Sequence, residues 1–466
     1  MSKPHILLKI QVLRDEMRMK KIIWGFFCAL FLTVQITARA EAETTEEFSL
    51  YAQAAVLMDG DTGRVLYGKN AETPMAMAST TKIMTCIVVL ENASLEDILT
   101  VSGYAAGMPK VKLYIQKGEQ YRVRDLLYSL MLESHNDSAV ALAEHVGRRF
   151  LEPELAEKPV KDYTVEESKR AVAAFAKLMN EKAAELGCKD SWFITPNGLD
   201  ATQEFVLKDG TTIQKEHCTT AAELARIMAY CIGESPQKES FLEITRTANY
   251  SFSANGRSFF CVNHNAFLSM MEGALSGKTG FTNKAGYCYV GSLRRDGRTF
   301  VVALLACGWP NNKSYKWSDT RELMQYGIDH YFYRSFLEEG TAFDEKKLKP
   351  ILVENGQTHI LGETAYTDIE ITDRRRQEDG SMDFVVDGTN EKNLEGLLLR
   401  EDEEIKVEYR LQKSLTAPVE AGAEVGEITY SVGGIVYRRE RIVAVSGVPE
   451  IDFVWCVRQI LTRFWL

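Results

Sequence analysis

The spacing of hydrophobic and polar positions changes along the chain and divides it into two regions. Short apolar runs at 54–58 and 64–67 flank the turn-forming residues 59–63, which predicts a β-hairpin. Helical spacing of apolar residues follows, and it predicts helices over 82–90, 126–132, 139–146, 171–186 and 220–231. Strands are predicted again at 287–293 and 299–307, on either side of an Asp-Gly turn, and a helix over 318–332 closes the region.

Strands at both ends of this region, with helices between them, predict an α+β domain whose terminal strands pair in one sheet. We place this domain at 45–336 and expect a charged linker at 337–349. The following region, 350–446, is strand-like throughout and predicts a small all-β domain. Its expected strands lie at 351–353, 369–371, 384–386, 405–407, 428–430 and 442–444.

The first forty residues have the pattern of a secretory signal. Basic residues precede an apolar run at 22–36, and the small residues Ala38 and Ala40 follow it. A membrane-spanning helix is the alternative, but a run of this length is shorter than the roughly 20 residues that crossing a bilayer requires. We therefore expect 1–40 to be removed and the remaining chain to be exported.

The last segment, 447–466, predicts an amphipathic helix. Apolar residues that include Phe453, Phe464 and Trp465 fill a broad arc of a helix drawn from Ile451, and Asp452 lies with the polar residues on the other side. The segment is too short to span a bilayer, so the pattern favours a helix that lies in a membrane interface. The alternative is a terminal helix that packs on its own domain.

Composition narrows the class of protein without naming a function. The 466 residues are 45% hydrophobic, which is enough to bury large cores, and 55 basic against 65 acidic residues give a net charge of −10. Such a chain has no basic field for nucleic acid, so we expect no nucleic-acid partner. The nine cysteines form no Cys-x-x-Cys pairs, which argues against a metal site and favours buried free thiols.

Candidate chemistry begins at Ser79 and Lys82, which lie three residues apart and so share one face of a predicted helix. An amine can take the proton of a neighbouring hydroxyl if burial or a second cation lowers its pKa. Ser79 and the two threonines after it also suit a helix N-cap, where the helix dipole favours an oxyanion. Alone, this spacing recurs by chance. Two further motifs, Ser134-His135-Asn136 and Lys278-Thr279-Gly280, follow in an order and context that chance rarely produces.

With these motifs the chain resembles the low-molecular-mass penicillin-binding proteins of the D-alanyl-D-alanine carboxypeptidase type. The resemblance is strong over roughly residues 50–335 and looser in the β domain, and the tail resembles the membrane anchor of that family. Its sequence blocks are 57–59, 62–63, 77–85, 136–139, 142–144, 196–199, 277–282 and 285–286. The resemblance implies a β-lactamase/transpeptidase-like catalytic domain, with an antiparallel sheet and helices, followed by the all-β domain and the amphipathic helix.

The resemblance also implies a reaction. Ser79 would attack the bond between the two terminal D-alanines of a peptidoglycan stem peptide, with Lys82 as general base. Ser134 would relay a proton to the leaving D-alanine. The reaction would need no metal and no organic cofactor, and β-lactams would acylate Ser79. It would take place at the outer face of the bacterial cytoplasmic membrane or in the cell wall.

A second group of residues would bind the substrate by the same resemblance. Asn136 would bond the substrate amide, and Lys278 and Thr279 would hold its terminal carboxylate, which internal peptide bonds lack. Gly280 would let the strand approach the substrate. The backbone N–H of Phe281, together with that of the nucleophile, would form the oxyanion hole.

Some residues depart from the family pattern, and two other functions stay open. His135 is interpreted as an exposed spacer, and Glu133 and Asp137 as capping or surface charges. Three further residues are interpreted as structural: His217, His264 and Cys261. The segments 148–170 and 205–216 look like inserts. A β-lactamase would share the motifs but would lack the β domain and tail. A non-catalytic wall-binding protein would not need the intact motifs.

Overall fold

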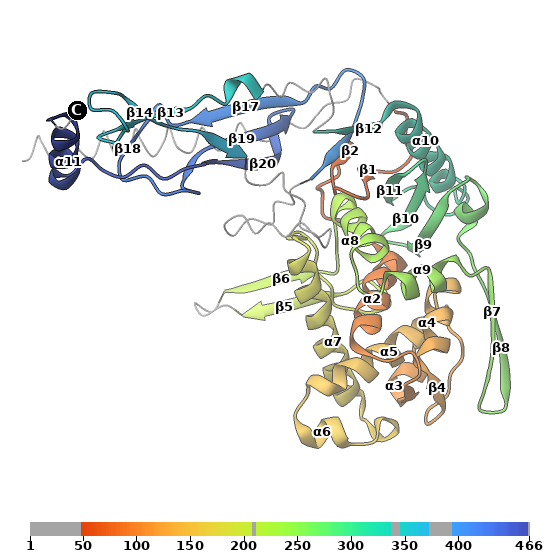
Figure 1. Cartoon of the computed structure of the whole chain (residues 1–466). Helices are drawn as coiled ribbons and strands as arrows, with labels where there is room; N and C mark the ends of the chain where they lie inside the picture. Colours follow the sequence, from red (N-terminus) through yellow and green to blue (C-terminus); the bar gives the residue numbers. More distant parts are fainter. Residues whose placement is uncertain (1–47, 207–210, 337–344, 372–393, 465–466) are drawn as a thin grey trace, which may run out of the picture. The chain divides into compact units, whose positions relative to one another are not determined.

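The computed structural model describes residues 48–206, 211–336, 345–371 and 394–464. Its main sheet is antiparallel with the strand order β2-β1-β11-β10-β9 (Figure 1). These strands are β1 (Ala54–Asp59), β2 (Val65–Lys69), β9 (Ala274–Thr282), β10 (Gly286–Arg295) and β11 (Arg298–Leu305). Pairing of β1 with β11 joins the two ends of the region at 45–336, which confirms the predicted α+β class.

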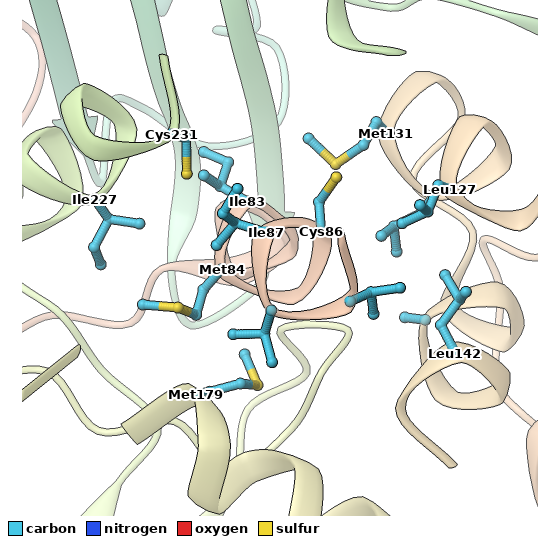
Figure 2. Packing of buried hydrophobic residues seen from close by; sticks show 14 of the residues in the cluster. Ile83, Met84, Cys86, Ile87, Leu127, Met131, Leu142, Met179, Ile227 and Cys231 are labelled. Atoms are coloured by element: carbon cyan, nitrogen blue, oxygen red, sulfur yellow. The ribbon is translucent and has the colours of Figure 1, made fainter. Parts of the chain in front are cut away.

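A single buried helix, α2 (Lys82–Asn92), lies at the centre of the helical part. Its residues from Lys82 to Leu90 are all buried, so it can pack on every side. The helices around it are α4 (Val123–Leu132), α5 (Asn136–Gly147), α7 (Val165–Glu185), α8 (Ala221–Gly233) and α9 (Lys238–Arg246). Figure 2 shows Ile83, Cys86 and Ile87 among side chains from α4, α5, α7 and α8. Burial of this apolar surface fixes the element that carries the first motif.

Shorter elements complete this region. Two β-hairpins, β5–β6 and β7–β8, extend from it, and the first corresponds to the insert expected near 205–216, of which 207–210 lie outside the described residues. The helix α10 (Tyr315–His330) packs on the sheet where Gly327 meets the Phe300 ring. The remaining elements are η1 (Ala78–Thr81), β3 (Ile98–Thr100), α3 (Gly103–Ala106), β4 (Gln120–Arg122), η2 (Arg148–Phe150), α6 (Pro153–Glu157), η3 (Val160–Asp162), β5 (Thr202–Val206), β6 (Thr212–Glu216), β7 (Asn249–Ala254), β8 (Arg257–Val262), η4 (Ala266–Ser269) and β12 (Phe332–Ser335).

The C-terminal region is built from short strands around a separate core, as predicted. Four strands pair in the order β15-β20-β19-β17 and three in the order β14-β13-β18, while β16 pairs with β12. The elements are η5 (Glu345–Lys347), β13 (Ile351–Glu354), β14 (Ala365–Thr367), β15 (Ile369–Ile371), β16 (Gly396–Leu399), β17 (Lys406–Leu411), β18 (Ser414–Thr416), β19 (Glu424–Val432) and β20 (Ile435–Ala444). The sequence did not predict β14, β16 or β18. The strand expected at 384–386 lies outside the described residues.

The two ends of the chain were both assigned from sequence. The signal predicted at 1–40 lies outside the described residues, as does most of the linker predicted at 337–349. The tail forms helix α11 (Phe453–Phe464), as expected. Within the described part of the chain, no helix combines the length and apolar character that crossing a bilayer demands.

The cysteines of the described residues are free thiols, as the sequence predicted. Six of the eight are buried, and the other two, Cys218 and Cys456, are partly exposed. Burial raises the pKa of the Cys288 thiol to about 12, so at neutral pH it behaves as a small apolar side chain.

Candidate active site

Ser79 lies in the turn η1, which leads directly into α2. Thr81 occupies the N-cap position of α2, as predicted, but the expected capping bond is not formed, because the hydroxyls beside Ser79 donate to carbonyls instead of accepting from helix N–H groups. Thr80 Oγ1 donates to the carbonyl of Met77 at 2.6 Å, and Thr81 Oγ1 donates to that of Ala78 at 2.8 Å. Ser79 therefore belongs to a tight 3-10 turn, and the two threonines that follow it are hydrogen-bonded to the carbonyls of the two residues that precede it.

Two glycines let other segments approach this turn closely. A Cβ on Gly280 of β9 would lie 2.8 Å from the backbone N of Ser79. A Cβ on Gly198 would lie 2.0 Å from the Ala78 carbonyl oxygen, and Gly198 also has a φ of +81° that disfavours other residues. Both positions require glycine if the strand and the loop are to reach Ser79.

Lys82 is completely buried, and its amine touches three oxygen atoms. Nζ lies 2.9 Å from Ser79 Oγ, 3.0 Å from Asn136 Oδ1 and 2.6 Å from the carbonyl oxygen of Asn197. Burial holds the pKa of Lys82 well below its ordinary value, and the positive charge of Lys278 lowers it further. The site thus favours a neutral amine in hydrogen-bond contact with a serine hydroxyl.

Ser134 lies in the turn between α4 and α5. Its φ is +64°, in the left-handed region that few residues other than glycine occupy. Its Oγ is buried, and none of the described residues forms a hydrogen bond with it. A buried hydroxyl without a partner is costly, so this atom is available to a bound molecule.

Two interpretations of the residues around Ser134 need correction. His135 is 8% exposed instead of being an exposed spacer, and its Nδ1 lies 2.8 Å from Ser129 Oγ. Asp137 is fully buried, and its carboxylate accepts hydrogen bonds from the backbone N–H groups of 113–115. Glu133 is the C-cap residue of α4, in line with its interpretation, and its side chain also accepts from the Val262 N–H at 2.8 Å, which joins the turn to β8.

The third motif lies on the edge strand β9. Lys278 is buried, its Nζ donates to the Thr279 carbonyl at 2.9 Å, and burial lowers its pKa to about 7. Phe281 is 38% exposed and packs its ring against Tyr287 across the strand pair. Direct contacts unite the first motif with Asn136 and Gly280. Within the described chain, no hydrogen bond joins Ser134, Lys278, Thr279 or Phe281 to Ser79.

Sequence reasoning missed the part that Asn197 plays in this arrangement. Its backbone carbonyl makes the shortest contact of Lys82, and its side-chain Oδ1 accepts from the Leu199 N–H at 3.1 Å. The block 196–199 was noted only as part of a resemblance. Every residue has a backbone carbonyl, so residue type could not indicate this contact with Lys82. Only the sequence block 196–199 as a whole could have pointed to it.

The histidines outside the motifs support the site without forming a metal centre. The Ile194 N–H donates to His217 Nδ1, so His217 Nε2 carries the proton and donates to Thr81 Oγ1 at 2.8 Å. Burial lowers the pKa of His217 to about 3, which keeps this ring neutral. His264 pairs with Glu133. In the described ranges, no group of His, Cys, Asp and Glu could hold a metal ion.

Comparisons with known proteins agree on the class of enzyme. Residues 40–149 and 168–306 match the family described as D-alanyl-D-alanine carboxypeptidase, and 399–450 match the C-terminal domain of penicillin-binding protein 5. The fold and these matches define a hydrolase of the penicillin-binding type. The chain belongs to the D-alanyl-D-alanine carboxypeptidase family.

Similar proteins share both regions of the chain. D-alanyl-D-alanine carboxypeptidase DacF of Bacillus subtilis is 24% identical over 426 residues, which cover 90% of this chain and 91% of that protein. DacC of Escherichia coli is 26% identical over 435 residues and covers 90% of each chain. The crystal structure of DacD from Francisella tularensis superposes with a TM-score of 0.59 at 20% identity, covering 90% of this chain and 98% of that one, and it supports the fold.

Proposed function

We propose that this carboxypeptidase removes the terminal D-alanine of peptidoglycan stem peptides through an acyl-enzyme on Ser79. The observation that carries the proposal is the contact of 2.9 Å between Lys82 Nζ and Ser79 Oγ in a fully buried setting. A buried amine of lowered pKa can accept the hydroxyl proton at neutral pH, which makes the serine a nucleophile.

The reaction then follows in two halves. Lys82 Nζ takes the proton of Ser79 Oγ while this oxygen forms a bond to the carbonyl carbon between the two D-alanines. The C–N bond breaks, and Ser134 relays the proton from Lys82 to the leaving D-alanine nitrogen. A water molecule next gives a proton to Lys82 and attacks the ester carbonyl. The C–O bond to Ser79 breaks, Lys82 returns the proton to Ser79 Oγ, and the shortened peptide is released.

Substrate selection is assigned to the edge strand and the neighbouring amide. Lys278 and Thr279 hold the terminal carboxylate, and Asn136 bonds the amide of the residue before the scissile bond. The backbone N–H groups of Ser79 and Phe281 stabilise the oxyanion, and the close approach of Gly280 to Ser79 supports this pairing. A β-lactam presents a similar chain end and acylates Ser79 in the same way.

The second candidate activity, that of a β-lactamase, fits the chain less well. Family membership and the β domain both favour a carboxypeptidase. The two differ in how fast the penicilloyl ester on Ser79 is hydrolysed, so deacylation measured after a single turnover separates them. We expect a long-lived adduct.

We also assign the enzyme to the outer face of the cytoplasmic membrane, held there by α11. The apolar side chains exposed on this helix fall within an arc of about 120° around the helix axis, when successive residues are placed 100° apart. They are Phe453, Val454, Val457, Ile460 and Leu461. Trp455 points to another side and is buried. An exposed apolar face of this kind supports adsorption to a lipid interface over packing on the chain's own β domain.

The direct test is release of D-alanine from a stem pentapeptide by the full chain. We expect release by wild type and its loss in Ser79→Ala. Ser253→Ala, an exposed hydroxyl on the β7–β8 hairpin, is the matched control and should keep full activity. Unchanged release by Ser79→Ala would end the serine mechanism.

A further inference from the structure

The turn that carries Ser134 is held from several directions by its flanking side chains. Glu133 bonds the backbone of β8, and Asp137 bonds the backbone of 113–115. Asn136 Nδ2 donates to the carbonyls of Pro109 and Lys110 at 3.3 and 3.2 Å. The hydroxyl of Ser134 lies between these anchors and has no partner among the described residues.

His135 supplies the anchor between this turn and the preceding helix. Its Nδ1 lies 2.8 Å from Ser129 Oγ of α4, and its backbone N–H points to the Ser129 carbonyl at 3.5 Å. Ser129 Oγ is also 2.8 Å from Ser138 Oγ in the first turns of α5. The His135 side chain therefore ties the turn to α4, and Ser129 extends this link to α5.

We infer that His135 is a positioning residue, which holds Ser134 in its left-handed conformation by bonding Ser129. The inference rests on the proposed function, in which Ser134 relays a proton. A serine at φ +64° returns to more favourable backbone angles unless its surroundings prevent this. The bond from the next residue to α4 restrains the C-terminal side of Ser134, as the bond of Glu133 to β8 restrains its N-terminal side, so the loss of the His135 bond should misplace Ser134 Oγ.

The surroundings of the His135 ring disfavour its protonated form. Burial is the main cause that lowers the pKa of His135, and Lys82 and His264, when protonated, act in the same direction. The carboxylates of Asp137 and Glu133 oppose them, but both are already bonded to backbone N–H groups. Protonation would add a buried charge close to Lys82, so acid should loosen the turn and reduce turnover.

Three variants test the inference in the full chain, with D-alanine release from a pentapeptide as the readout. His135→Leu keeps the size of the side chain and removes its polar atoms, and Ser129→Ala removes the partner. His135→Asn places a polar atom near the position of Nδ1 and cannot be charged. Ser253→Ala serves as the control on an exposed hairpin.

We expect His135→Leu and Ser129→Ala each to lower kcat about tenfold, with KM within about twofold, because one hydrogen bond that positions Ser134 is lost. The double variant should be no worse than either single one, since both remove the same contact. His135→Asn should restore kcat at pH 8 to within about threefold. At acidic pH the kcat of His135→Asn should fall less steeply than that of wild type, because asparagine cannot gain the proton that His135 gains.

Other results would overturn the inference. Wild-type kcat and pH profile in both His135→Leu and Ser129→Ala would show that the contact positions nothing. An equal loss of kcat in His135→Asn and His135→Leu would show that shape alone matters. Should His135→Leu fail to fold in a thermal melt, Ser129→Ala and His135→Asn decide the question. A wild type that releases no D-alanine would instead overturn the proposed function.

Discussion

Asn136 Oδ1 lies 3.0 Å from Lys82 Nζ, and the other end of the amide fixes which atom faces the amine. Its Nδ2 donates to two backbone carbonyls, so the oxygen must point to Lys82. The carbonyl of Asn197 can likewise only accept. A neutral amine has two N–H groups and one lone pair. When both N–H groups bond these oxygens, the lone pair is directed at the hydroxyl of Ser79.

This geometry predicts that a permanently charged side chain cannot replace Lys82. Lys82→Arg places a permanent cation near the serine that cannot accept a proton, since a guanidinium stays protonated at any relevant pH. We expect acylation by penicillin to slow by about 10²- to 10⁴-fold, the usual contribution of a general base. Stopped-flow acylation rates check this. Lys177→Arg, at an exposed site on α7, should leave the rate unchanged, and a similar rate in both variants would contradict the role of Lys82.

The lowered pKa of Lys278 predicts an alkaline limb in the pH profile. Lys278 binds a carboxylate only when protonated, and burial lowers its pKa to about 7 in the free enzyme. As pH rises through this value the cation is lost, so kcat/KM for a pentapeptide should fall. The arginine in Lys278→Arg stays charged. In this variant kcat/KM should therefore no longer fall as pH rises through 7, even if its maximum value is lower than in wild type. The same limb in both proteins would show that Lys278 does not set it.

Glu144 predicts a pH-dependent stability. It is buried in α5, and burial raises its pKa to about 7, although the hydroxyls of Ser168 and Ser102 act in the opposite direction. A raised carboxyl pKa stabilises the fold below the unfolded value of about 4.5, and this contribution is lost as pH rises towards 7. Glu144→Gln resembles the protonated form. It should raise the free energy of unfolding at pH 8 by up to about 3 kcal/mol, and by much less at pH 4. Denaturant unfolding at both values checks this, and an equal change at both would refute it.

The exposed face of α11 predicts binding to lipid vesicles. Val454→Asp combined with Leu461→Asp places two charges on that face, so sedimentation with anionic vesicles should be lost. Release of D-alanine from a soluble pentapeptide should stay within about twofold, because α11 lies far along the chain from the motifs. A variant that still sediments with vesicles would argue that the helix serves another purpose.

Local patterns were sufficient for much of the fold. The strands β1, β2, β10 and β11 of the main sheet and the helix α2 follow from short apolar runs and from the spacing of apolar residues. The edge strand β9 was indicated only by the family resemblance. The β7–β8 hairpin was missed although its signal was present. Asn255 and Gly256, both at positive φ, form a turn that sequence rules favour for a hairpin. The short strand β16 offered only four residues, too few for a period to be recognised.

The candidate site was predictable only where residue type carries the chemistry. Ser79, Lys82 and Asn136 were all expected, and the structure brings them into contact. The burial of His135 and Asp137 depends on segments that only the folded chain places beside them. A polar residue between two helices looks exposed in sequence, and its partners are not encoded by its neighbours.

The most direct test of the central claim is mass spectrometry of the full chain after incubation with benzylpenicillin. The account predicts a mass increase of one penicillin molecule, located after proteolysis in the peptide that contains Ser79 and absent from Ser79→Ala. A stable adduct on another residue, or an equal adduct in Ser79→Ala, would contradict it.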